Sequence, residues 1–204
     1  MTDPGNEADK GGPPPFGGRR LLYVVTGALS AAHTPFWVNW LSMSYPELEI
    51  RIAVTRSAER FATRQALAPL IPGDVFTDAW PSEAATVAPH VELAEWADTV
   101  VVNPATLSFV ARLATGLADT PVMLALQCTR AAVAVAPSLP PGGVDSEVFA
   151  KHAAALRARR NVVLAPPVMG LSVTTGRNDA ALNAPLPDVI AALEALRAGI
   201  GRAA

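Results

Sequence analysis

A run of small and hydroxyl-bearing residues follows the first apolar segment of the chain. Leu21 to Val25 is uniformly apolar, and Thr26 to Ala32 then supplies Gly27, Ala28 and Ser30. Small side chains let a ligand approach the backbone amides, and a helix that begins there would point its free N–H groups and positive dipole end at a phosphate. The run is not GxGxxG, so the usual dinucleotide-binding motif is absent. A tight strand-to-helix turn without a ligand explains the run equally well.

A second run of the same kind follows the next apolar segment, Ile50 to Val54. Thr55 and Ser57 carry hydroxyl groups there, and Ser57 could cap the helix expected after it. For Ser57 by itself, a simple helix cap is the better interpretation. Because the carboxyl ends of parallel strands share one edge of a sheet, the two runs together favour a phosphate-bearing ligand between them.

His90 is the candidate for proton transfer. Imidazole titrates near neutral pH and can take or give a proton in catalysis. A polar surface residue or a helix cap is the simpler interpretation of an isolated histidine. The other two histidines, His33 and His152, fall at a helix start and on an amphipathic helix, and neither pairs with a cysteine or a carboxylate at metal-ligand spacing. We therefore expect no metal site.

The overall composition limits the remaining function classes. Of 204 residues, 50% are hydrophobic and 17% are charged, and the formal net charge of -2 argues against nucleic-acid or membrane-surface binding. No stretch of about 18 apolar residues occurs, so no transmembrane helix is expected. The single cysteine, Cys128, excludes a disulfide within the chain and suits a reduced, cytoplasmic protein. Residues 1–18 are rich in glycine and proline and predict a disordered leader before a single domain over 19–204.

Alternating apolar runs and amphipathic segments predict the elements that carry these residues. Continuous apolar runs are typical of strands buried on both faces. The alternation of strands and helices predicts an α/β fold, with a doubly wound, Rossmann-like or flavodoxin-like parallel sheet flanked by helices. Ligands of such folds bind beyond the carboxyl ends of the strands. The predicted strands lie near residues 21–25, 50–54, 99–102, 122–126, 131–135 and 161–164, and the helices near 35–43, 58–67, 90–96, 107–117, 146–159 and 186–196.

One longer stretch of the chain resembles a known family. The segment His90-Val91-Glu92-Leu93 leads through Ala97-Asp98 into an apolar strand that ends at Pro104-Ala105-Thr106. This arrangement resembles the homo-oligomeric flavin-containing cysteine decarboxylases, in which a His-[Ile/Val]-Glu-Leu segment precedes a PASANT-like motif. The resemblance covers about residues 20–180 in the same order.

The resemblance implies a role for each of these motifs. His90 would be the catalytic base. FMN is the usual flavin of the family, with FAD as the alternative, and the proteins assemble as trimers, often as dodecamers, with the flavin near a subunit interface. The implied flavin contacts are Gly27, Ala28 and Ser30 in the first loop, Thr55, Ser57 and Phe61 in the second, and Pro104, Ala105, Thr106 and Ser108 at the PASANT position.

Three departures from the family pattern bear on the ligands. Ser108 stands where the PASANT motif commonly has asparagine, so part of the flavin contact changes. Pro140 occupies the position of an asparagine implicated in holding the substrate carboxylate, and proline has neither a side-chain donor nor a backbone N–H. The substrate clamp would fall on residues 166–177, with Met169 and Arg177 as candidate substrate contacts. This segment lacks the cysteine with which the clamp of coenzyme A biosynthesis helps to reduce the enethiol product.

The resemblance therefore implies flavin-dependent oxidative decarboxylation of the C-terminal cysteine of a ribosomal precursor peptide. The flavin would take a hydride equivalent from the cysteine Cβ, and the resulting thioaldehyde would lose CO₂ to leave an aminoenethiol, on the way to the aminovinyl-cysteine of a lantibiotic. Phosphopantothenoylcysteine decarboxylase is one alternative, and a non-catalytic flavin-binding regulatory subunit is another. A flavin prenyltransferase is a more distant one.

Overall fold

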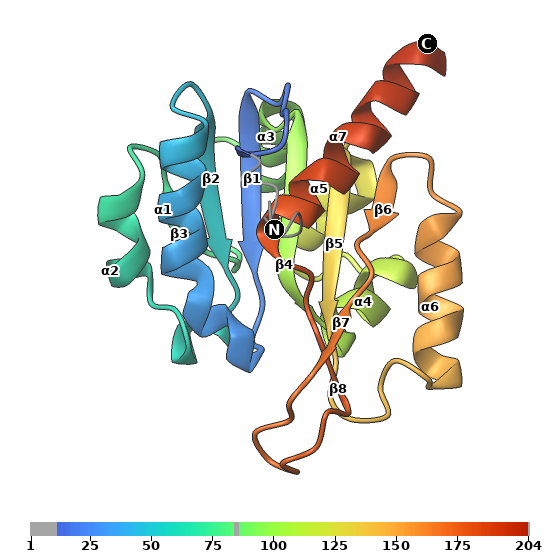
Figure 1. Ribbon diagram of the computed structural model, residues 1–204. Coiled ribbons are helices and arrows are strands. Elements are labelled where there is room, and N and C mark those ends of the chain that lie inside the picture. Colours follow the sequence, from blue (N-terminus) through green and yellow to red (C-terminus); the bar gives the residue numbers. More distant parts are fainter. Residues whose placement is uncertain (1–11, 84–85, 204) are drawn as a thin grey trace, which may run out of the picture.

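The fold is built on one six-stranded parallel sheet, as seen in the computed structural model, which describes residues 12–83 and 86–203 (Figure 1). The strand order is β3-β2-β1-β4-β5-β6, so the winding direction reverses between β1 and β4. This is the Rossmann order, and the predicted doubly wound α/β fold is confirmed. The strands are β1 (Arg20–Val25), β2 (Glu49–Val54), β3 (Val75–Thr77), β4 (Thr99–Thr106), β5 (Ala132–Ser138) and β6 (Val162–Leu164).

Helices cover both faces of this sheet. In Figure 1, α1 and α7 lie on the near face, and α3 and α5 lie behind it. The first core contains Val38 of α1 and Ile190 of α7, and the second contains Leu93 of α3 and Met123 of α5. The helices are α1 (Thr34–Ser44), α2 (Arg64–Leu67), α3 (Pro89–Trp96), α4 (Leu107–Ala114), α5 (Pro121–Cys128), α6 (Glu147–Arg157) and α7 (Leu186–Ala203).

The central strands are mostly apolar because each of them faces both cores. Along β1, Leu21, Tyr23 and Val25 pack in the first core, whereas Leu22 and Val24 pack in the second. Successive side chains of a strand point to opposite faces of the sheet, so a continuous apolar run is what a doubly covered strand requires.

The strand predicted over residues 122–126 is wrong, because this segment lies in α5. Pro121 stands in the first turn, and the hydroxyl oxygen of Thr120 accepts a hydrogen bond from the N–H of Met123 at 3.3 Å, which caps the helix. The run is apolar because α5 is deeply buried. A short buried helix and a buried strand cannot be told apart by periodicity. Cys128 is therefore the exposed last residue of a helix, not the end of a strand.

Other local differences concern short elements. The helix predicted over 58–67 is divided into a 3-10 turn, Ala58–Arg60, and the one-turn helix α2, which Thr63 caps. The sequence analysis did not predict β3, nor the antiparallel hairpin of β7 (Val168–Gly170) and β8 (Ala180–Leu182). Each of these strands has three residues, which is too short to show a period of two.

Residues 12–18 do not behave as the predicted disordered leader. The Phe16 ring packs edge-on against Tyr45 at 5.5 Å between centroids, and the Tyr45 hydroxyl donates to the Pro14 carbonyl at 2.7 Å. The N–H of Gly17 donates to the Glu194 carboxylate at 2.9 Å. The rest of the predicted leader, residues 1–11, lies outside the described residues. Within the described part of the chain, no helix has the length and apolar character needed to cross a membrane.

Candidate active site

A cavity of about 740 Å³ opens at the carboxyl ends of β1, β4 and β5. Its walls come from the loop after β1, the first residues of α4, the segment after β5, and the chain from β7 to the start of α7. This is where the winding direction of the sheet reverses, and doubly wound folds bind their ligands at that point. The volume falls in the range of small-molecule and cofactor sites.

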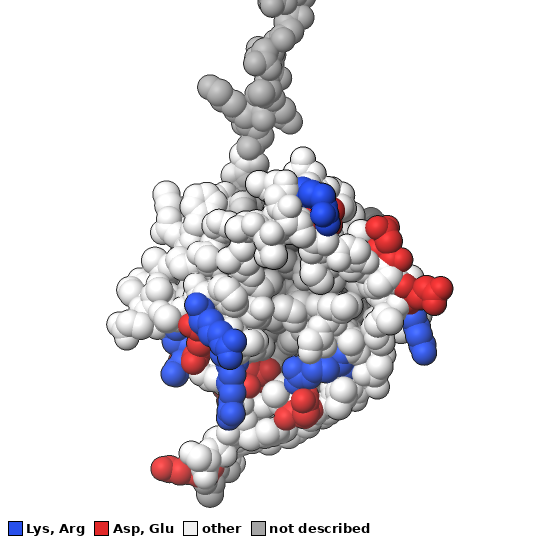
Figure 2. All heavy atoms as spheres, turned by 90° about the horizontal axis from the view of Figure 1, so that it is seen from below, with Lys and Arg blue, Asp and Glu red and all other residues white. Residues whose placement is uncertain are grey.

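The cavity carries no formal charge on its walls. None of the described residues that line it is Lys, Arg, Asp or Glu, whereas many are apolar or hydroxyl-bearing. Figure 2 shows this face, with an uncharged hollow near its middle and charged side chains around the hollow. Apart from the imidazole of His33, the described lining offers a ligand only neutral hydrogen-bonding groups and apolar surface.

Thr26 holds the first loop against the PASANT-like segment. Its hydroxyl donates to the carbonyl of Pro104 at 2.7 Å and accepts from the N–H of Thr106 at 2.9 Å. Thr106 in turn caps α4 by accepting a hydrogen bond from the N–H of Phe109 at 3.3 Å. The loops after β1 and β4, which flank the reversal point, are thus fixed relative to each other.

The second loop supports the first loop from outside the cavity. A Cβ atom at Gly27 would lie 2.6 Å from the Cβ and Oγ atoms of Ser57, so only glycine fits at this close approach. Ser57 does not form the predicted helix cap, and its hydroxyl instead lies 3.3 Å from that of Thr55. Thr55, Ser57 and Phe61 do not line the cavity.

The structure brings together six of the residues that the sequence singled out. Pro104 and Ala105 are buried behind the cavity wall, where they shape the end of β4. His90, Met169 and Arg177 are outside the lining. The residues brought together are Gly27, Ala28, Ser30, Thr106, Ser108 and Pro140.

The predicted substrate clamp contributes to the cavity, but through other residues than those named. Leu171 to Thr174, in the loop between β7 and β8, form part of the wall. Met169 is exposed on β7, and the Nε atom of Arg177 donates to the Asp179 carboxylate at 2.7 Å. Because Arg177 is paired and lies outside the lining, it is not placed to bind a carboxylate in the cavity.

Two polar residues of the cavity were missed by the sequence analysis. Ser138 ends β5, and its hydroxyl oxygen lies 3.4 Å from that of Ser30 across the reversal point. Asn183 follows β8 directly, and its amide Nδ2 donates to Oδ1 of Asn103 at 2.6 Å. No motif marks either residue. A lone asparagine close before a proline is typical of an ordinary turn.

His90 lies in a separate region, at the start of α3. Its ring packs edge-on against Trp80, with 5.7 Å between centroids, and the Trp80 indole N–H donates to the Asp119 carbonyl at 2.8 Å. The Nδ1 atom of His90 is buried and has no hydrogen-bond partner among the described residues. The neighbouring surface is apolar, since Trp80 is 45% and Val91 51% exposed. We refer to His90, Trp80 and Val91 as the His90 region.

A buried carboxylate links the His90 region to α5. Asp78, directly after β3, accepts a hydrogen bond at Oδ1 from the N–H of Val122 at 3.0 Å, while its Oδ2 has no partner. Burial raises the pKa of the Asp78 carboxyl above its ordinary value, and the hydrogen bonds only partly offset this effect. Asp78 thus fixes the start of α5 at an electrostatic cost.

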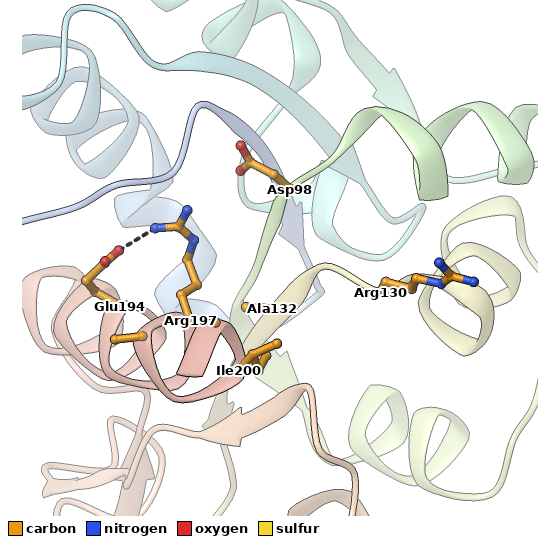
Figure 3. A pocket seen from close by; sticks show the side chains of 8 residues that line it. Asp98, Arg130, Ala132, Glu194, Arg197 and Ile200 are labelled. Carbon is orange, nitrogen blue, oxygen red and sulfur yellow. Dashed lines mark hydrogen bonds and ion pairs between the residues drawn. The ribbon is translucent and has the colours of Figure 1, made fainter. Parts of the chain in front are cut away.

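A further cavity of about 440 Å³ lies at the opposite edge of the sheet, near the amino ends of β4 and β5 (Figure 3). Its polar groups include the ion pair of Glu194 and Arg197 at 2.8 Å. Glu194 also accepts the hydrogen bond from Gly17, so these groups fix the N-terminal segment. Among the described residues, no three His, Cys, Asp or Glu side chains form a possible metal site.

Comparison with known proteins decides the family. A family model described as Flavoprotein matches residues 15–196. The chain belongs to the Flavoprotein family. This flavoprotein is 36% identical over 184 residues to a cypemycin cysteine dehydrogenase (decarboxylating) from a Streptomyces species, covering 89% of this chain and 94% of the relative.

Two solved structures resemble this flavoprotein in both sequence and fold. The crystal structure of the cypemycin decarboxylase CypD has 33% identity and a TM-score of 0.72, covering 92% of this chain and 97% of that one. TvaF, an FMN-dependent cysteine decarboxylase from thioviridamide biosynthesis, has 32% identity and a TM-score of 0.65, covering 72% of this chain and 89% of that one.

The residues of the cavity fit a flavin. Gly27 and Ala28 line the cavity with little or no side chain, and the hydroxyls of Ser30 and Ser138 offer neutral donors beside them. Leu107 and Leu139 supply apolar surface for a ring system. Neutral donors together with apolar walls are typical of cofactor sites.

Proposed function

We propose that this flavoprotein binds FMN in the cavity and oxidatively decarboxylates the C-terminal cysteine of a peptide, giving an aminoenethiol. The observation that carries the proposal is the uncharged cavity at the reversal point of the sheet, in a chain similar over most of its length to a cypemycin cysteine dehydrogenase (decarboxylating). TvaF is FMN-dependent, which favours FMN over FAD. The product would be the precursor of an aminovinyl-cysteine in a lantibiotic-like peptide.

The residues of the first loop would hold the phosphate end of the cofactor. The Ser30 hydroxyl is a suitable donor, and the small residues Gly27 and Ala28 beside it would let the phosphate approach the backbone. Thr106 and Ser108 would contact the ring system from the start of α4. When bound, the flavin supplies the acceptor for the hydride equivalent that leaves the cysteine Cβ.

The clamp segment favours a peptide over phosphopantothenoylcysteine as the substrate. Residues 166–177 contain no cysteine that could reduce the enethiol, and the chain is similar over most of its length to a cypemycin cysteine dehydrogenase (decarboxylating). Both observations support release of an unreduced aminoenethiol.

His90 would act as the base that assists deprotonation of the substrate thiol, and it would do so from a second copy of the chain. His90 is not part of the cavity lining of its own chain, and the exposed apolar side chains of Trp80 and Val91 beside it provide a surface for association. A trimer, or a dodecamer of trimers, would bring the His90 region of one copy to the cavity of the next. The lone free thiol and a ribosomal peptide substrate suit a cytoplasmic assembly.

The proposal is tested with the purified flavin-loaded protein and a short peptide that ends in cysteine. We expect a mass loss of about 46 Da from the peptide, equal to CO₂ and two hydrogen atoms, together with bleaching of the flavin absorbance under anaerobic conditions. A bound flavin without mass loss from any peptide ending in cysteine would contradict the decarboxylase and favour the regulatory alternative.

A further inference from the structure

An apolar cavity that takes a substrate carboxylate must supply hydrogen-bond donors for it. A buried carboxylate without donors is unstable by several kcal/mol, so its donors determine whether the substrate binds. The cavity offers neither lysine nor arginine among its described lining residues, Arg177 is paired with Asp179, and Pro140 has no donor. Apart from the imidazole of His33, the side-chain donors of the described lining are therefore neutral groups.

Asn183 is a side-chain amide placed in this cavity. It is half-buried, it lines the cavity, and one of its two amide N–H groups donates to Oδ1 of Asn103 at 2.6 Å. The second N–H is left for a ligand, because an amide nitrogen has two hydrogens to donate. The lining also offers hydroxyl groups, among them those of Thr106 and Ser172, whose oxygens accept hydrogen bonds from the N–H groups of Phe109 and Thr175. Asn183 is the only side-chain amide among the described lining residues.

Asn103 fixes the orientation of Asn183 from behind. It is only 1% exposed, lies within β4, and its own Nδ2 is buried with no acceptor in the described part of the chain. A buried amide with only one of its two polar atoms hydrogen-bonded lowers the stability of the fold. Such groups occur where the side chain belongs to a ligand site. If the amide oxygen and nitrogen of both side chains exchange places, Nδ2 of Asn103 donates to Oδ1 of Asn183. Asn183 then still has an amide N–H group for a ligand.

The backbone places Asn183 close to the segment that lacks a donor. Leu139 and Ala181 form an antiparallel bridge, with N···O distances of 2.8 Å and 3.2 Å. This bridge ties the chain around Asn183 to the chain around Pro140, and both residues line the same cavity. Asn183 thus supplies an amide to the same cavity in which Pro140 provides no donor.

We propose that Asn183, oriented by Asn103, binds the C-terminal carboxylate of the substrate. This inference rests on the proposed function. A neutral amide suits the reaction, because it orients the carboxylate without the ground-state stabilisation that an ion pair would add and that loss of CO₂ would have to overcome.

The test measures binding of unreactive peptides to the flavin-loaded protein. The probes are a short peptide ending in serine with a free carboxylate and the same peptide ending in a carboxamide, since serine has no thiol to be oxidised. Wild type should bind the peptide with the free carboxylate (the acid) more tightly than the carboxamide. In Asn183→Ala the acid should bind about ten to one hundred times more weakly, while the carboxamide is unaffected. In Asn183→Asp, which is nearly isosteric, the preference should reverse through charge repulsion.

Asn178→Ala is the matched control, because Asn178 is exposed in the same β7–β8 loop and does not line the cavity. It should bind both probes as wild type does. An unchanged preference for the acid in Asn183→Ala and Asn183→Asp would overturn the inference. Loss of flavin from both variants would also overturn it, since Asn183 would then hold the cofactor.

Failure of the role of Asn183 can be distinguished from failure of the proposed function. Mass loss from a cysteine peptide in wild type, with unchanged acid preference in the variants, would leave the decarboxylase standing and remove only the role of Asn183. If wild type neither decarboxylates the cysteine peptide nor binds the acid probe in preference to the carboxamide, both proposals fail.

Discussion

The cavity and the His90 region differ in how complete each is within one chain. The cavity gathers residues from both halves of the sheet, and the hydrogen bonds of Thr26 hold its two principal loops together. The His90 region has a candidate base with a buried, unpartnered Nδ1 and exposed apolar neighbours, but it does not contribute to the cavity. This difference supports the proposal that one chain carries two parts of a reaction site, which a second copy would bring together.

The largest effect is expected at His90. The variant His90→Asn should lower turnover of a cysteine peptide by at least about 100-fold, because it removes the proton-transferring group, while bound flavin is retained. Mass spectrometry of the peptide and absorbance of the bound flavin measure the two properties separately. The control is His152→Asn on α6, which should retain wild-type activity. A His90→Asn variant with normal turnover would remove His90 from the mechanism.

The next effect is expected in the first loop. Gly27→Val should lose most of the bound flavin, because any Cβ atom there would lie 2.6 Å from Ser57 and would force the two loops apart. The flavin content after gel filtration is the measurement. Gly199→Val is the control, since a Cβ atom at Gly199 meets nothing within 4 Å. A Gly27→Val protein with a full complement of flavin would show that the cofactor lies elsewhere.

A smaller effect, on the free energy of unfolding, is expected at Asp78, two residues before Trp80 of the His90 region. Asp78→Ala leaves the N–H of Val122 without its acceptor, and the free energy of unfolding should fall by about 1–3 kcal/mol. Urea unfolding followed by circular dichroism measures this, with the exposed Asp145→Ala as the control. Equal stabilities of the two variants would mean that this hydrogen bond contributes nothing measurable.

The smallest effect is a dependence of stability on pH. Burial raises the pKa of Asp78 in the folded state, so the unfolded chain ionises first as the pH rises. The free energy of unfolding of wild type should therefore decline, relative to Asp78→Asn, from about pH 4 up through the raised folded pKa. Urea titrations of both proteins across this pH range supply the difference. A wild-type curve parallel to that of Asp78→Asn would contradict the raised pKa.

The sequence predicted the α/β fold because the central strands are long and buried on both sides. It failed at residues 122–126, where a deeply buried helix is as continuously apolar as a strand. Gly27, Ser30, Thr106 and Pro140 were found through motifs that stay local after folding.

Asn183 could not be found in this way. Its position in the site depends on the pairing of Ala181 with Leu139 and on a contact with Asn103, which is 80 residues away in the chain. Local sequence contains no trace of such long-range contacts, so a residue of this kind appears only once the chain is folded.

The most direct test of the two-copy site is to mix two inactive variants. His90→Asn retains an intact cavity, and Gly27→Val retains an intact His90 region. If His90 of one copy serves the cavity of another, co-expression of the two variants should restore about one quarter of wild-type decarboxylation, since half the cavities are intact and half of those meet an intact His90. No activity from the mixed assembly, with both variants shown to be present in it, would contradict a site shared between copies.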